Sequence, residues 1–255
     1  MKALILAAGY GTRMRPLTDG VPKALIPIAD RPLIEYLFDR LETLPELGEV
    51  AVVANARFYE QFVEWFGERA TASRSIRLLN DGSTSNENRR GAIGDIRFAI
   101  DELGLIEKPD DLLVVAGDHI FEIDFAALVR AFHSHDATTI GAERESDPRE
   151  LRLCGVMELD AQSRVMGFVE KPAEPKTDVL SPPIYLYHRR DVPRVAAYLA
   201  EGQNPDAPGH FLEWLHRRSQ VYAHFLGGRR FDIGSIESYR KADELFRARA
   251  SRPRG

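Results

Sequence analysis

The sequence predicts an α/β fold, built as a single mixed, mostly parallel sheet with flanking helices. Short apolar runs alternate with stripes of apolar residues at helical spacing, which is the pattern of a sheet covered by helices. Leu112–Ala116 is a continuous run of leucine, valine and alanine, typical of a central strand buried on both faces. With 255 residues, the chain is long enough to bury a sizeable core without disulfides.

The first half contains three further apolar runs that predict strands, over residues 3–6, 50–54 and 76–79. After the first of these, a helix is predicted with Asp30 as its N-cap and Pro32 at its start. Its apolar face is formed by Leu33, Leu37 and Leu41. A second helix follows the next strand, because Phe58, Phe62, Trp65 and Phe66 repeat at helical spacing and predict core contacts.

The pattern changes after residue 137, where the predicted strands become short and closely spaced. Gly155–Leu159 and Val165–Glu170 predict a hairpin, and further strands are predicted over Ile184–Tyr187, Val221–Phe225 and residues 230–232. A closing helix is predicted over residues 236–249, with Ser235 better placed as its N-cap than Asp232. Residues 1–250 therefore form one predicted domain, followed by a frayed tail over residues 251–255.

Composition excludes several classes of protein. The net charge of −5 and the isoelectric point near 5.9 argue against a nucleic-acid partner held by a broad basic surface. Cys154 is the only cysteine, so no intrachain disulfide forms, and a reducing compartment fits. The apolar run at residues 3–8 is too short for a secretory leader, and no stretch is long enough to span a membrane. A cytoplasmic protein without a membrane partner is expected.

The loop after the first strand predicts a phosphate site. It contains Gly9 and Gly11, which let backbone N–H groups approach an anion closely. Arg13 and Lys23 add two cations at the same edge of the sheet. The spacing differs from the dinucleotide-binding fingerprint, because Met14 occupies the third glycine position, and no Walker A Gly-Lys-Ser/Thr follows. A loop with these N–H groups and cations fits a polyanion, and we expect a nucleoside triphosphate.

Two acidic residues predict a magnesium site near that loop. Asp118 follows the predicted central strand, at the edge where open α/β sheets bind ligands. Asp232 lies at a second strand-to-helix junction, in the segment Phe231-Asp232-Ile233-Gly234. Two carboxylates from distant parts of a chain can hold one Mg²⁺ from opposite sides, with phosphates and waters as the other ligands.

The N-terminal string Leu-Ala-Ala-Gly-x-Gly-Thr-Arg-Met-x-Pro-Leu-Thr, followed by Pro-Lys-Ala-Leu-x-Pro-Ile, resembles the signature of the sugar-phosphate nucleotidyltransferases. Val169-Glu170-Lys171-Pro172 and the Gly-Asp and Asp-Ile-Gly segments also resemble that family. The resemblance implies a Rossmann-like, GT-A-like fold. Its nucleotide-binding half spans about residues 1–137, and a small β-rich acceptor half spans about residues 138–250.

The resemblance also implies roles for individual residues. Nucleotide contacts fall on Leu6, Ala8, Gly9, Gly11, Thr12, Arg13, Gly91 and Ala92. The acceptor is expected at Gly155, Glu170 and Lys171, and the metal at Asp118 and Asp232. Arg13, Lys23 and Lys171 are the expected catalytic cations. Because neighbours on a strand point to opposite sides, Glu170 and Lys171 are not expected to pair.

The implied activity is Mg²⁺-dependent transfer of a nucleotidyl group from a nucleoside triphosphate to a sugar 1-phosphate, with release of pyrophosphate. The segment 80–93 departs from the usual base-reading loop, and Pro208–Trp214 replaces the usual acidic acceptor segment, so neither base nor acceptor is assigned. Two alternatives stay open. One is a CTP-dependent enzyme acting on an alcohol phosphate such as phosphocholine or inositol phosphate. The other is a catalytically silent protein that binds a nucleotide sugar. A homo-oligomer is possible under each.

Overall fold

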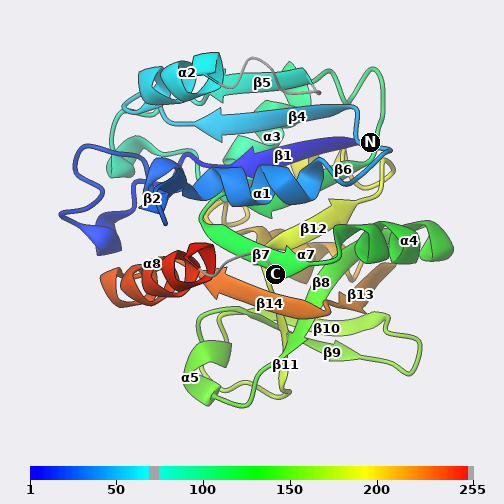
Figure 1. Ribbon diagram of the computed structural model, residues 1–255. Coiled ribbons are helices and arrows are strands. Elements are labelled where there is room, and N and C mark those ends of the chain that lie inside the picture. Colours follow the sequence, from blue (N-terminus) through cyan, green and yellow to red (C-terminus); the bar gives the residue numbers. More distant parts are fainter. Residues whose placement is uncertain (69–74, 252–255) are drawn as a thin grey trace.

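The computed structural model describes residues 1–68 and 75–251, and a mixed sheet with helices on both faces forms its centre (Figure 1). Along the sheet the strands lie in the order β10-β9-β11-β8-β12-β6-β1-β4-β5, with β13 paired to β8. The mixed α/β fold predicted from the sequence is confirmed. Of the predicted frayed tail, residues 252–255 lie outside the described residues, and Ser251 caps the last helix.

The N-terminal half contributes a parallel block of four strands: β1 (Lys2–Leu6), β4 (Glu49–Ala54), β5 (Ser75–Asn80) and β6 (Leu112–Ala116). All four were predicted from their apolar runs. Leu6, the last residue of β1, pairs with Ala116 of β6 and with Val53 of β4. The carboxyl ends of these strands therefore meet at one edge, where a ligand site is expected.

The second half extends the sheet mainly by antiparallel pairing. β12 (Ile184–Tyr187) joins β6 to β8 (Thr138–Arg144), and β11 (Val179–Ser181) links β8 to the hairpin of β9 (Gly155–Leu159) and β10 (Val165–Glu170). β13 (Val221–Phe225) runs parallel to β8. The predicted hairpin is confirmed residue for residue. The sequence reading missed β8 and β11.

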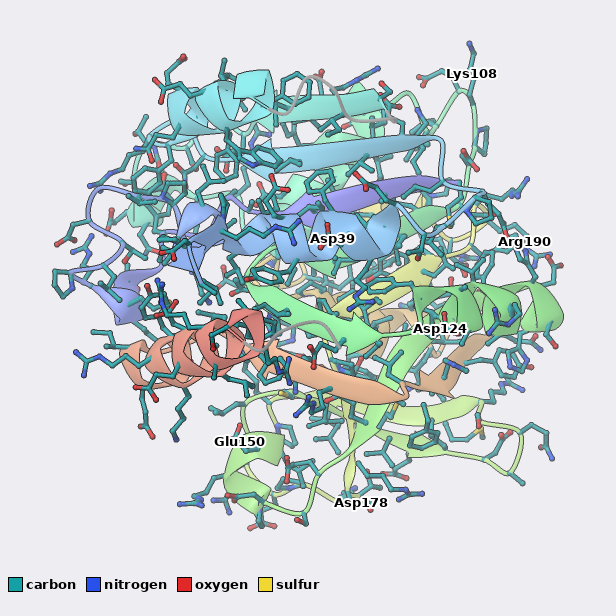
Figure 2. All side chains as sticks on the ribbon, viewed as in Figure 1. Asp39, Lys108, Asp124, Glu150, Asp178 and Arg190 are labelled. Carbon is teal, nitrogen blue, oxygen red and sulfur yellow. The ribbon has the colours of Figure 1, made fainter. Side chains whose placement is uncertain are left out.

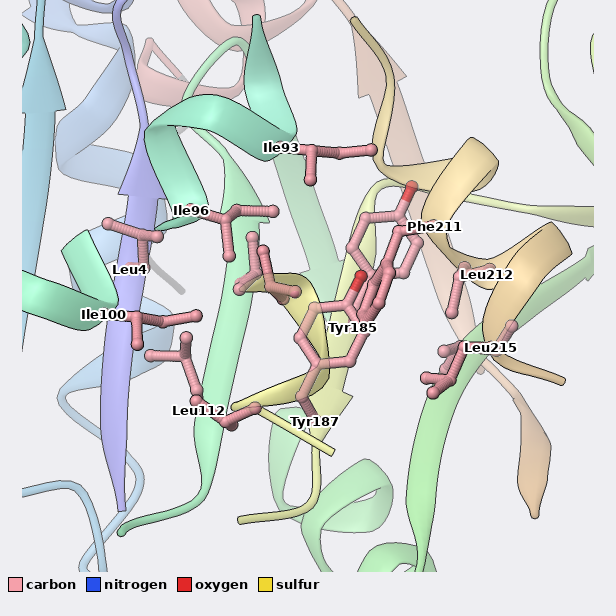
Figure 3. Close-up of a cluster of buried hydrophobic side chains, with 14 of the residues drawn as sticks. Leu4, Ile93, Ile96, Ile100, Leu112, Tyr185, Tyr187, Phe211, Leu212 and Leu215 are labelled. Atoms are coloured by element: carbon pink, nitrogen blue, oxygen red, sulfur yellow. The ribbon is translucent and has the colours of Figure 1, made fainter. Parts of the chain in front are cut away.

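Alternation along β1 explains the two helical layers. Leu4 faces α3 (Ala92–Glu102), α6 (Arg194–Ala200) and α7 (Pro208–Leu215), whereas Ala3 and Ile5 face α1 (Leu33–Leu41), α2 (Tyr59–Glu68) and α4 (Phe125–His135). Figure 3 shows the first of these layers, where Ile93 and Ile96 of α3 belong to the same buried cluster as Tyr185 of β12 and Phe211 of α7. Each central strand is thus buried on both faces.

The predicted N-cap of α1 is wrong. Pro32 occupies the N-cap position, and Asp30 lies in the turn between the two short strands β2 (Pro27–Ile28) and β3 (Arg31–Pro32). Asp30 has a φ of 63°, a left-handed conformation that a short polar side chain tolerates. Its carboxylate forms an ion pair with Arg247 at 2.7 Å instead of capping a helix.

A separate two-stranded ribbon carries one side of the candidate site. β7 (His119–Ile123) pairs antiparallel with β14 (Gly228–Asp232), and Asp232 lies opposite His119. α8 (Ile236–Ala250) follows, with Ser235 as the N-cap that the sequence predicted. Figure 1 shows α8 lying beside β14, in continuation of the ribbon. β7, which follows β6 after only Gly117 and Asp118, was not predicted from the sequence.

Charged side chains cover the outside of the molecule. Figure 2 labels five of them at the surface of the molecule: Asp39, Lys108, Asp124, Asp178 and Arg190. Glu150 lies at the short helix α5 (Pro148–Leu151), next to the β9–β11 region. Among the described residues, no helix is both long and apolar enough to cross a membrane.

Candidate active site

A cavity of about 370 Å³ opens at the carboxyl edge of the parallel strands. Its wall contains the whole predicted nucleotide-binding set: Leu6, Ala8, Gly9, Gly11, Thr12, Arg13, Gly91 and Ala92. Lys23 and Asp118 line the same cavity. These residues lie together because β1 and β6 end, and α3 begins, at this edge of the sheet. The structure therefore brings together in one hollow what the sequence placed in three distant segments.

The glycine loop is held in a fixed shape. Gly11 has a φ of 59°, and a Cβ atom there would lie 2.8 Å from Cγ2 of Thr18. The hydroxyl of Thr18 donates a hydrogen bond to the Gly11 carbonyl at 2.8 Å, which closes the loop into a short 3-10 helix over Thr12–Met14. Asn55, which the sequence reading did not single out, is fully buried and donates to the Ala8 carbonyl at 2.9 Å. A loop fixed in this way suits backbone contacts with an anion.

Lys23 and Asp118 form a close ion pair, with the ammonium nitrogen 2.5 Å from Oδ2 of the carboxylate. Nδ1 of His119 lies 2.6 Å from the other oxygen of Asp118. Burial acts to raise the pKa of Asp118, but the charges and hydrogen bonds of His119 and Lys23 outweigh it and hold this pKa far below its usual range. Asp118 is therefore ionised at neutral pH.

Asp118, His119 and Asp232 form the cluster best suited to a cation among residues 1–68 and 75–251. One ligand atom from each lies within 4.8 Å of the others. Asp232 reaches the cluster because it lies opposite His119 in the β7–β14 ribbon, where its Oδ1 lies 3.7 Å from Nε2 of His119. The predicted pairing of the two aspartates is thus present in the geometry. His119 was missed, although its position next to Asp118 in the sequence was a usable signal.

The donor set of this cluster fits a hard divalent cation. Mg²⁺ prefers oxygen ligands and usually takes one or two carboxylates, with phosphates and waters completing the octahedron. Asp118 and Asp232 supply those carboxylates. His119 is better suited to orient them, because its ring is buried, stacks on Phe121 and faces one carboxylate with each nitrogen.

A second cavity, of about 410 Å³, adjoins the first through Arg13, which lines both. Lys171, Arg230 and Asp232 also line it, together with Cys154. Arg230 forms an ion pair with Glu143 at 3.1 Å, and Lys171 is more than half exposed. The predicted acceptor cation Lys171 and the predicted metal ligand Asp232 therefore share a cavity next to the glycine loop.

Glu170 and Gly155 line neither of the two cavities, but they support the neighbouring wall of the second one. The Glu170 side chain is 8% exposed, and its Oε2 occupies the place of a Cβ atom at Gly209, the second residue of α7. A Cβ atom at Gly155 would collide with the ring of Phe168 at 2.4 Å and lie 3.1 Å from Oε2 of Glu170. Burial raises the pKa of Glu170. The two glycines therefore provide the room in which this carboxyl group lies against α7.

The expectation that Glu170 and Lys171 do not pair is wrong. The Lys171 ammonium lies 3.5 Å from Oε1 of Glu170. The strand ends at Glu170, and Lys171 has a φ of 49°, so strand alternation no longer applies to its side chain. A hydrogen bond from the Lys171 N–H to the Cys154 carbonyl fixes this turn.

Gly91 and Ala92 lie in the wall of the first cavity, where they contact the backbone of the loop before α7. A Cβ atom at Gly91 would lie 2.6 Å from the carbonyl oxygen of Pro205. The N–H groups of Ala92 and Ile93 donate to the carbonyls of Asp206 and Pro205. The start of α3 is therefore capped by the loop before α7, which brings Asp206 and Pro208 into the cavity wall.

A family model described as nucleotidyl transferase matches residues 2–249. The chain belongs to the nucleotidyl transferase family. Among named relatives, it is 28% identical to a UTP–glucose-1-phosphate uridylyltransferase from Synechocystis sp., across 95% of this chain. It spans 62% of that relative's length.

Solved structures of this family share the fold. A Bacillus anthracis protein, named provisionally as a glucose-1-phosphate thymidylyltransferase and solved with sucrose, superposes with a TM-score of 0.80 at 22% identity, over 97% of this chain and 95% of that one. A UDP-glucose pyrophosphorylase complexed with UDP-glucose gives a TM-score of 0.79 at 20% identity, over 97% and 98% of the two chains. This family member therefore has the fold that its N-terminal signature implied.

Proposed function

We propose that the protein transfers a nucleotidyl group from a nucleoside triphosphate to a sugar 1-phosphate, in a Mg²⁺-dependent reaction that releases pyrophosphate. The observation that carries the proposal is the convergence of Asp118, Asp232 and Lys23 beside the two cavities that Arg13 of the glycine loop lines. The names of the relatives, which act on glucose 1-phosphate or bind UDP-glucose or UTP, support the same reaction class.

The chemistry requires little from the protein beyond positioning and charge. An acceptor phosphate oxygen attacks the α-phosphorus in line, a new P–O bond forms, and the bond to the β-phosphate oxygen breaks. The acceptor is already an anion, so no general base is needed. Bringing two polyanions together and stabilising the leaving pyrophosphate are the main costs.

Each cation of the site has a place in that scheme. The loop amides, Arg13 and Lys23 neutralise the triphosphate, and Lys171 holds the acceptor phosphate in the adjoining cavity. Arg13 lines both cavities, so it is positioned to contact both substrates. Asp118 and Asp232 would hold Mg²⁺, which would supply positive charge to the phosphates in the transition state.

A matrix of substrates tests the proposal directly. The full chain is incubated with ATP, GTP, CTP, UTP or dTTP against several sugar 1-phosphates, phosphocholine and inositol phosphate, with Mg²⁺ or with EDTA, and pyrophosphate is measured. We expect Mg²⁺-dependent release with a sugar 1-phosphate. Release only with an alcohol phosphate contradicts the acceptor class. Nucleotide binding without any release identifies a silent binding protein.

A further inference from the structure

The first cavity contains a buried carboxyl group that the proposed mechanism does not use. Asp95, in the first turns of α3, lines the cavity wall and is only 7% exposed. Its Oδ1 has no hydrogen-bond partner among the described residues. A buried acceptor without a partner is unfavourable, so its presence in a ligand cavity indicates that a bound ligand supplies the missing donor.

The polar groups around Asp95 form hydrogen bonds with one another and leave its Oδ1 without a donor. Asp81, from the loop after β5, is 2% exposed and interacts with Asp95, while both of its carboxylate oxygens accept from the Ser83 hydroxyl. Arg90 is nearby, but its Nε donates to the backbone carbonyl of Asp81 and its guanidinium stacks on Phe98. The Tyr10 hydroxyl, also near, donates to Ser83.

Burial, followed by the charge of Asp81, raises the pKa of Asp95 to about 8. At neutral pH Asp95 therefore keeps its proton, which the neighbouring Asp81 carboxylate can accept as a hydrogen bond. The remaining oxygen of Asp95 is left as an acceptor.

The position of Asp95 within the cavity indicates which part of a nucleotide it meets. Gly11, Thr12, Arg13 and Lys23 line the phosphate-binding side. Asp95 enters the same wall from α3, next to Ala92 and close to the loop that carries Asp81. A nucleoside triphosphate with its phosphates on the glycine loop therefore directs its base toward α3.

We propose that Asp95 reads the nucleobase and selects bases that carry an exocyclic amino group. This inference rests on the proposed function. The unpartnered acceptor oxygen of Asp95 in the cavity wall attracts the amino group of cytosine, adenine or guanine. It repels the paired carbonyl oxygens that flank the single N–H of uracil and thymine.

Equilibrium binding tests this inference without an identified acceptor. Calorimetry with the full chain and Mg²⁺ measures the Kd of ATP, GTP, CTP, UTP and dTTP. We expect an amino-bearing nucleotide to bind at least ~10-fold more tightly than UTP and dTTP, the size of one hydrogen bond in a buried site. Tighter binding of UTP or dTTP overturns the inference while leaving the proposed function intact. Failure to bind any of the five contradicts the proposed function itself.

The ligand side of the contact can be altered without changing the protein. The preferred nucleotide is compared with its analogue lacking the amino group, which is purine riboside triphosphate for ATP, ITP for GTP, or zebularine triphosphate for CTP. We expect the analogue to bind at least ~10-fold more weakly to the unaltered chain. Equal binding of the two overturns the inference, whatever the behaviour of any variant.

Two substitutions at Asp95 separate a reading role from a structural one. Asp95→Leu removes the acceptor, so the preferred nucleotide and its analogue should bind equally well. Asp95→Asn should keep the preference, because its amide can donate to Asp81 in place of the proton while its oxygen remains an acceptor. Asp101→Asn, on the exposed side of α3, is the matched control. A preference that survives in a folded Asp95→Leu variant overturns the inference.

Discussion

Lys23 and Asp118 lie 2.5 Å apart, and this contact illustrates how single residues set the chemistry of the site. The lysine and His119 keep the carboxylate ionised despite burial, so a cation ligand is available at neutral pH. Arg13 behaves differently. Within the described residues it has no recorded acidic partner, and it lines both cavities. Its charge is therefore available to substrates.

Substitution of Arg13 tests that availability. Arg13→Ala should lower pyrophosphate release by about 10²-fold or more, because a cation aimed at developing charge in a water-poor site contributes strongly to turnover. Arg15→Ala is the control, since Arg15 is exposed and pairs with Asp19 at the surface. Steady-state kinetics on both variants make the comparison. Equal turnover of the two variants contradicts the role of Arg13.

The raised pKa of Asp95 predicts a pH dependence of stability. The group binds a proton with a pKa of about 8 in the folded chain and near 3.8 when unfolded. Between these values the folded state holds a proton that the unfolded state has lost, so stability falls as pH rises through this window. Asp95→Asn removes this slope and should raise the free energy of unfolding at pH 8 by several kcal/mol, because each pKa unit corresponds to about 1.4 kcal/mol. Urea unfolding at pH 5 and pH 8 measures the difference. The prediction is contradicted if the free energies of unfolding of the wild type and the variant differ by the same amount at pH 5 and at pH 8.

At the scale of elements, the acceptor side depends on how α7 meets β10. Gly209 near the start of α7 leaves the space in which the Glu170 carboxyl group lies, and Gly155 on β9 leaves room for the Phe168 ring. Backbone positions rather than side chains therefore decide where the end of β10 and Lys171 lie.

Substitution of Gly209 tests this packing. In Gly209→Ala the new methyl group would lie 1.8 Å from Oε2 of Glu170, so the carboxyl group must move and Lys171 with it. We expect KM for the acceptor to rise about 10-fold, with little change in nucleotide affinity. Gly202→Ala, where nothing lies within 4 Å and φ is 71°, controls for general loss of stability. An unchanged acceptor KM contradicts the coupling.

At the scale of the whole molecule, the cation cluster joins two separate sheets. Asp118 follows β6 of the central sheet, and Asp232 ends β14 of the small ribbon, 114 residues later in the chain. α8 is tied to the N-terminal half by the ion pair of Arg247 with Asp30 and to β7 by that of Arg249 with Glu122. A ligand that bridges the aspartates therefore links distant parts of the fold.

Cation binding should consequently stabilise the complete chain. Mg²⁺ together with a nucleoside triphosphate should raise Tm by several degrees, because ligands that bind only the folded state stabilise it by mass action. Asp118→Asn and Asp232→Asn should each lose most of that increase, whereas Asp124→Asn, at the surface cap of α4, should keep it. Differential scanning fluorimetry gives the values. An undiminished shift in both site variants excludes a shared cation.

The sequence by itself determined the strands of the parallel block, the hairpin, the glycine loop and both aspartates, because apolar periodicity and turn chemistry are local properties. It also carried the family signature. Only the tertiary structure decided what depends on distant neighbours: Asp30 in a turn rather than at a helix cap, and Asp95 buried beside Asp81. Burial and charge at these positions come from segments far apart in the chain, so no local pattern could reveal them.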